Sequence, residues 1–85
     1  MYSIRYAKSA AKALAKMPHK IAKAMQAELA TMALAPSAYR GDWKPLHGSQ
    51  FWRLRKGEYR AICEVRGNEL LILVVKIGSR GDVYK

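Results

Sequence analysis

The first half of the chain has one short alternating segment followed by two segments of helical period. Tyr2–Tyr6 alternates apolar and polar residues, which predicts a short strand. Ser9 can cap a first helix that runs to Met17, and Pro18 begins a second helix. Pro36 ends it, because a residue that precedes proline avoids the helical conformation. An αα-hairpin is therefore expected, with apolar stripes formed by Ala10, Ala13, Leu14 and Met17 and by Ile21, Met25, Leu29 and Met32.

The second half changes to the period of two that is typical of strands. Ser37–Gln50 contains prolines and glycines and is expected to be a loop. Leu70–Val75 is apolar at every position, so its strand should be central in the sheet and covered on both faces. Gly78 then opens a C-terminal tail. The predicted strands are Phe51–Lys56, Tyr59–Arg66 and Glu69–Ile77, with turns at Lys56–Glu58 and Gly67–Asn68.

These elements predict an α+β fold in which residues 1–85 form one small domain. The N-terminal strand and the three-stranded antiparallel meander would form a four-stranded sheet, with both helices on one face. Alternate residues of a strand point to opposite faces. We expect Trp52, Leu54 and Cys63 to face the helices. The other face would then carry Arg53, Arg55 and Arg60, with Arg80 and Tyr84 at its rim.

The charge of the chain limits its partners. Sixteen lysines and arginines against six acidic residues give a net charge of +10 and a pI near 10.1. A domain this basic is expected to bind nucleic acid, an anionic membrane surface or an acidic protein. The lone Cys63 excludes an intrachain disulfide and fits a reducing compartment. We see no signal peptide, and Leu70–Val75 is too short to span a bilayer, so a cytoplasmic protein is expected.

A stripe of lysines follows the first helix into the second. It consists of Lys8, Lys12, Lys16 and Lys20. A solvated face that keeps the protein soluble explains it, and so does docking on a polyanion such as ribosomal RNA. A membrane-surface helix fits less well, because the apolar stripe of the first helix is mostly alanine.

Two sequence blocks resemble those of a known family. Trp52–Arg60 (WRLRKGEYR) resembles the aromatic–basic–x–basic…Tyr-Arg block of the RelE/ParE superfamily of toxin–antitoxin toxins. Val75–Tyr84 (VKIGSRGDVY) is similar to its closing Gly-x-Arg…Val-Tyr block, and Lys44–Gly48 resembles its basic loop before the sheet. In this superfamily the RelE branch cuts mRNA in the ribosomal A site, whereas the ParE branch acts on DNA gyrase and generally lacks the basic-plus-tyrosine set. The presence of that set favours the RelE branch.

The resemblance implies RNA cleavage without metal or cofactor. The ribose 2′-OH would attack the neighbouring phosphorus and release the 5′-oxygen, leaving a 2′,3′-cyclic phosphate. By the resemblance, Arg53 and Arg60 would stabilise the scissile phosphate, and Arg80 would protonate or neutralise the leaving oxygen. Tyr84 would stack on a substrate base. Lys44 and Lys56 would join the lysine stripe in binding RNA and the ribosome.

Arg55 departs from the family pattern. The matching position is often a lysine that is treated as the general base, whereas arginine is effectively never deprotonated in proteins. Nearby alternatives are His47, Glu58 and Lys56, of which His47 ranks first because an unperturbed histidine titrates near neutral pH. Lys56 has the wrong strand parity, and Glu58 has the parity of Arg60 but adjoins the turn. Alternatively no strong base exists, and catalysis relies on electrostatics and positioning.

The family also implies partners. A toxin of this kind is expected to bind a cognate acidic, RelB-like antitoxin, the ribosome and mRNA, and to reach operator DNA only through the antitoxin complex. It should not bind membranes. Two other functions remain open on the sequence: a non-enzymatic gyrase inhibitor of the ParE type, and a simple basic RNA-binding module.

Overall fold

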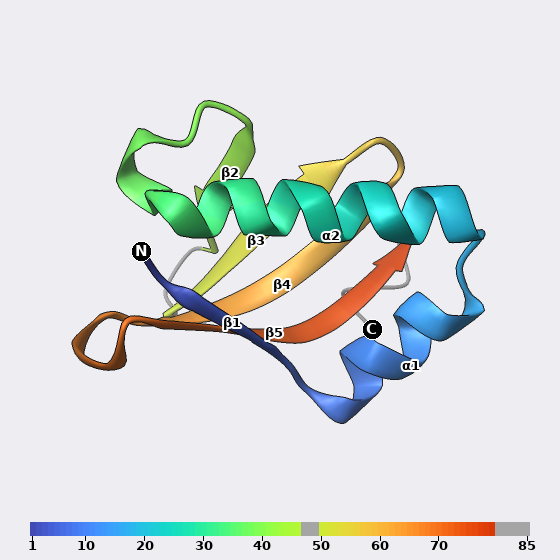
Figure 1. The fold of residues 1–85 in the computed structure, drawn as a ribbon, viewed down its shortest axis with the longest axis horizontal. Helices are drawn as coiled ribbons and strands as arrows, with labels where there is room; N and C mark the ends of the chain where they lie inside the picture. Colours follow the sequence, from blue (N-terminus) through green and yellow to red (C-terminus); the bar gives the residue numbers. More distant parts are fainter. Residues whose placement is uncertain (47–49, 80–85) are drawn as a thin grey trace.

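The computed structural model describes residues 1–46 and 50–79, in which two helices lie against one five-stranded sheet (Figure 1). The α+β class predicted from the sequence is confirmed. The strands are β1 (Ser3–Tyr6), β2 (Asp42–Pro45), β3 (Phe51–Lys56), β4 (Tyr59–Arg66) and β5 (Leu71–Ser79). The helices are α1 (Lys8–Lys16) and α2 (His19–Leu34), and short 3-10 turns occupy Pro36–Ala38 and Gly67–Glu69.

The sheet has the strand order β1-β5-β4-β3-β2. β1 runs parallel to β5, and the remaining neighbours pair antiparallel. The expectation of a four-stranded sheet is wrong, because β2 lies inside the segment 37–50 that was expected to be a loop. This strand is only four residues long, so it shows little alternation of apolar and polar residues. It also ends in Pro45, and proline is confined to edge strands and strand ends. It is defined by its pairing with β3 rather than by its own sequence.

The core lies between the sheet and α2, which crosses the strands in Figure 1. Met25, Leu29 and Met32 of α2 are fully buried, as predicted. They meet the inward side chains of the sheet, which are Leu54, Ala61, Cys63, Ile72, Val74 and Ile77. Ile21 is the exception to the predicted stripe, with 39% of its surface exposed. It lies in the first turns of α2 and lines a pocket with residues of the β3–β4 turn, beyond the covered part of the sheet.

The helix boundaries follow the prolines but not the predicted cap. Ala7, not Ser9, is the N-cap of α1, and no side chain caps that end. Ser9 instead donates a hydrogen bond from its hydroxyl to the Val75 carbonyl of β5 (2.8 Å), so it fastens the helix to the sheet. At the other end, Ala35 leaves the helical region before Pro36 (φ −159°, ψ 87°), as expected. Neither of the helices described is long and apolar enough to cross a membrane.

The β4–β5 pair departs from the predicted hairpin at both ends. A 3-10 turn and Leu70 in the left-handed region (φ 50°) connect the strands in place of a two-residue turn. Gly78 is still part of β5 and does not open a tail. A bulge opposite Ile62 and Cys63 changes the register by one residue, which lets both Val74 and Ile77 face the core. β5 is central and buried towards the helices, but its other side is only half-buried.

Candidate anion-binding site on the open sheet face

Strand register places the predicted arginines on the sheet face that the helices leave uncovered, here called the open face. Leu54 pairs with Ala61, and both side chains are fully buried towards the helices. Neighbouring positions along each strand therefore point the opposite way. One cross-strand row of the open face contains Asp42, Arg55, Arg60 and Gly78, and the next contains Lys44, Arg53, Ile62 and Lys76.

A polar pocket lies at the end of the first row. Its volume is about 390 Å³. Its lining residues come from the end of β3, the β3–β4 turn, the start of β4 and the end of β5: Arg55, Gly57, Glu58, Arg60 and Ser79. We call it the arginine pocket. The residues around this space thus carry two guanidinium groups, a hydroxyl and a carboxylate, and its volume is sufficient for a phosphate and a sugar.

Arg60 is the most constrained group of this pocket. Only 9% of the residue is exposed, and its Nη1 is buried without a hydrogen-bond partner among the described residues. Leaving a buried donor of this kind unpaired costs about 1–3 kcal/mol, and more for a charged group. Its cross-strand partner is Gly78, which adds no side chain to the row. The arrangement therefore presents a fixed cation with one guanidinium nitrogen, Nη1, that has no partner among the described residues.

Arg53 is held differently, by a carboxylate that the sequence analysis did not identify. Its Nη2 lies 2.5 Å from Oδ1 of Asp42, and Arg55 Nη1 lies 3.9 Å from Oδ2 of the same residue. The Arg53 side chain is 19% exposed and that of Arg55 is 52% exposed. Asp42 thus neutralises part of the positive charge of Arg53 and Arg55. It was missed because its segment was expected to be a loop.

The predicted RNA-binding lysines are spread over three surfaces. Lys8, Lys12 and Lys16 are exposed along α1, and Lys44 is exposed on the open face at the edge strand β2. Lys20 and Lys56 line a second pocket of about 300 Å³ on the α2 side of the β3–β4 turn. Lys56 Nζ lies 3.9 Å from Oε1 of Glu28 in α2, as its strand parity required.

Three predicted site residues, His47, Arg80 and Tyr84, lie outside the described residues. Lys76 lies on the open face beside Arg53 and Ile62 and was not identified from the sequence. Its orientation depends on the bulge in the β4–β5 pair, so simple alternation does not reveal it.

The aromatic and sulfur groups near the sheet serve packing. Trp43 and Trp52 stack on the helix side, with ring centroids 5.0 Å apart. Burial raises the pKa of the Cys63 thiol to about 12, so this thiol stays neutral at physiological pH and is a poor nucleophile. The chemistry available on the open face is therefore that of guanidinium, ammonium, hydroxyl and carboxylate groups.

Comparison with known proteins places this chain in a family. Residues 4–84 match the family model described as the ParE toxin of the type II toxin–antitoxin system parDE. No curated protein matches the chain significantly by sequence.

Solved structures of toxin–antitoxin complexes share the fold. The RelE–RelB complex of Pyrococcus horikoshii OT3 matches with a TM-score of 0.80 and 25% identity, covering 94% of this chain and 96% of that chain. The RelB–RelE complex of Methanococcus jannaschii matches with a TM-score of 0.75 and 26% identity, covering 93% of each. RelBE2 of Mycobacterium tuberculosis matches with a TM-score of 0.75 and 25% identity, covering 93% and 98%. Since the family model spans nearly the whole sequence, the chain belongs to the ParE toxin family of type II toxin–antitoxin systems, and through it to the RelE/ParE superfamily.

Proposed function

We propose that the protein is a ribosome-dependent endoribonuclease that cleaves mRNA in the A site. The observation that carries this proposal is the buried Arg60 guanidinium, whose Nη1 has no partner among the described residues and which lines a polar pocket. A phosphate oxygen would supply the missing acceptor. Arg55, on the neighbouring strand, lines the same pocket and adds a second cation. A surface that only needed to be basic would not require a buried, unpaired arginine.

The reaction is attack of the ribose 2′-OH on the adjacent phosphorus, with release of the 5′-oxygen. Negative charge grows on the phosphoryl oxygens in the transition state, and fixed donors aimed at that charge accelerate the step. Arg60 serves this purpose best, because its burial holds it in place. Arg53, which is paired with Asp42, contributes positive charge from the next row. Arg80 and Tyr84 keep the roles implied by the family, at the leaving oxygen and at a substrate base.

The basic open face also accounts for the partners. The three relatives described above were solved as complexes with their antitoxins. An acidic antitoxin segment would cover the open face of this chain and neutralise its net charge of +10. The ribosome and mRNA would be bound by the same charge, with the lysines of α1 on ribosomal RNA. Operator DNA would be reached only through the antitoxin complex, and the protein would act in the cytoplasm.

The direct test is to add the purified protein to translating ribosomes and to map mRNA ends. We expect cuts within the A-site codon and 3′ ends that carry a 2′,3′-cyclic phosphate. Arg60→Ala should abolish most of the cutting, whereas Arg40→Ala, which removes an exposed arginine outside the strands, should not. Intact mRNA with the wild-type protein would refute the proposal.

A second candidate function is inhibition of DNA gyrase without catalysis. The observation that favours it is the family model itself, which is named for ParE. In this case the protein would inhibit supercoiling, produce no RNA ends, and tolerate Arg60→Ala in the supercoiling assay. Running the two assays on one preparation separates the candidates.

A further inference from the structure

We propose that Glu58 is the proton acceptor for the attacking 2′-OH. This inference rests on the proposed RNA cleavage. The family position that often holds a basic lysine is Arg55 in this chain, so the activated hydroxyl needs another base. Among the described residues that line the arginine pocket, Glu58 is the one with a carboxylate that can accept a proton.

The other lining residues are unsuited to the task for chemical reasons. Arg55 and Arg60 are guanidinium groups that remain protonated in proteins. Gly57 has no side chain, and the Ser79 hydroxyl is itself a proton donor of high pKa. The pocket therefore combines groups that stabilise negative charge with a single carboxylate at its rim.

Among the described residues, the open face carries two other carboxylates: Glu64 is bound by Gln50 and Arg66, and the surroundings of Asp42 also argue against it. Both of its oxygens face arginines, Arg53 at 2.5 Å and Arg55 at 3.9 Å. These guanidinium groups occupy the Asp42 oxygens, which leaves them less available to a substrate hydroxyl. Within residues 1–46 and 50–79, Glu58 forms no ion pair. Its lone pairs are thus available to a substrate hydroxyl.

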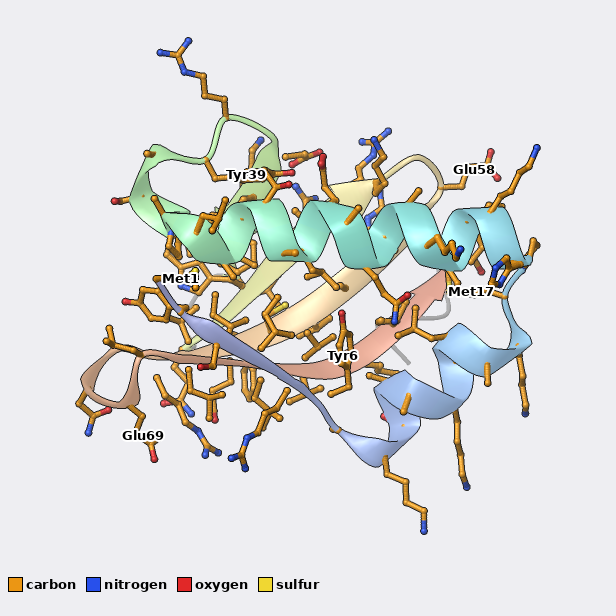
Figure 2. All side chains as sticks on the ribbon, viewed as in Figure 1. Met1, Tyr6, Met17, Tyr39, Glu58 and Glu69 are labelled. Atoms are coloured by element: carbon orange, nitrogen blue, oxygen red, sulfur yellow. The ribbon has the colours of Figure 1, made fainter. Side chains whose placement is uncertain are left out.

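The turn itself positions Glu58. Gly57 has φ +62°, a conformation that side chains other than glycine rarely adopt, and it lets β3 return directly into β4. Lys56 pairs with Tyr59 across this turn, so Glu58 is anchored between two paired positions. Figure 2 shows Glu58 at this turn, at the opposite end of the molecule from Glu69. The charged and titratable groups around Glu58 are Arg55 and Arg60 in the arginine pocket, and Lys20, Lys56 and Tyr59 on the α2 side.

The step balances without any other reactant. A Glu58 carboxylate oxygen takes the proton of the 2′-OH while the O2′–P bond forms. The P–O5′ bond breaks, and the departing 5′-oxygen takes a proton from water. Glu58 later returns its proton to solvent. Arg60 and Arg55 hold the charge of the phosphoryl oxygens throughout.

The test is the pH dependence of single-turnover mRNA cleavage on ribosomes by wild-type protein, Glu58→Gln and Glu58→Asp. A positioned base contributes about 10²–10⁴-fold, so Glu58→Gln should lower the rate by at least about 10²-fold. Because Glu58 rather than hydroxide removes the proton in the wild-type protein, its rate should stay nearly constant with pH. The Glu58→Gln rate should rise about tenfold per pH unit, because hydroxide must then remove the proton. Glu58→Asp should recover part of the rate with the flat profile.

The controls separate this inference from the function on which it rests. Glu69→Gln removes an exposed carboxylate far from the arginine pocket and should leave rate and profile unchanged. Ribosome binding should be the same for all variants, so a loss of binding would assign Glu58 a docking role and overturn the inference. A flat profile or an undiminished rate for Glu58→Gln would also overturn it, while wild-type cleavage stood. Absence of wild-type cleavage would instead refute the proposed function.

Discussion

The two faces of strand β4 are almost equally buried but differ in what their side chains contact. Towards the helices, Ala61 and Cys63 have no exposed surface and are packed among apolar residues. On the open face, Arg60 is 9% exposed and Ile62 is 7% exposed. Only the open face contains a buried charge with an unused donor among the described residues. Burial alone therefore does not distinguish a core from a site, whereas an unpaired polar atom does.

The largest expected effect concerns the open face. Arg60→Ala should reduce single-turnover cleavage by about 10²–10³-fold, the range found when one donor to a transition-state oxyanion is removed. It should leave the melting temperature the same or higher, because the variant no longer buries an unpaired charge. Rates on ribosomes and thermal unfolding measure the two quantities. If Arg60→Ala lowered the melting temperature but left the cleavage rate of the folded protein unchanged, Arg60 would be a structural residue. The two faces of β4 would then not differ in function.

The same strand pair offers the opposite experiment on the helix side. Leu54→Ala should lower the free energy of unfolding by about 2–5 kcal/mol, because it removes a fully buried side chain and leaves a cavity. The folded fraction should retain its cleavage rate. Denaturant unfolding, with activity scaled to the folded fraction, tests this. A large loss of intrinsic rate would show that the faces are coupled.

A smaller effect comes from Cys63. Its pKa is raised from 9.0 to about 12 by burial. A raised folded-state pKa gives stability that is present below the unfolded pKa and is lost as pH rises from 9 towards 12. The loss at pH 10 should be about 1.4 kcal/mol relative to pH 8.

Cys63→Ala should remove this part of the pH dependence. Tyr39, whose pKa is also raised by burial, contributes equally to both proteins. The pKa of Tyr6 is raised by burial and by the neighbouring Cys63, so the variant also loses that second contribution. Urea titrations of the two proteins at pH 8 and pH 10 measure the difference. An equal loss of unfolding free energy between pH 8 and pH 10 in the two proteins would mean that the thiol reaches solvent. The helix side would then be less closed than the structure indicates.

The smallest effect is expected at Asp42. Ion pairs near the surface typically contribute at most about 1 kcal/mol, and the Asn side-chain oxygen can still accept from the part-buried Arg53, so Asp42→Asn should change stability little. It should free charge on Arg53 and Arg55 and strengthen binding of a short single-stranded RNA several-fold at low salt. Fluorescence anisotropy over a salt series measures both affinity and slope. Weaker binding would show that Asp42 is needed to orient Arg53.

The sequence predicted the side of the sheet on which the arginines lie, because two consecutive antiparallel strands alternate cleanly. It did not predict β2, since a four-residue edge strand ending in proline has no pattern of its own. Asp42 was therefore not identified as a site residue, because it lies in β2. The bulge in the β4–β5 pair concealed Lys76, because a one-residue shift depends on partner contacts. Glu58 had the correct parity but adjoined a turn, where alternation no longer applies. The catalytic roles stay predictions.

The parallel pairing of β1 with β5 has a consequence for the order of folding. Ser3 pairs with Leu71 and Tyr6 with Val74, so β1 must wait for β5, which is synthesised much later. Contacts of such high sequence separation slow folding. Until β5 is made, the sheet lacks the pairing of β5 with β1 and the pairing of β5 with β4. The row that contains Arg60 and Gly78 is then incomplete. The row that contains Arg60 and Gly78 is therefore completed only after the last strand of this sheet has been synthesised.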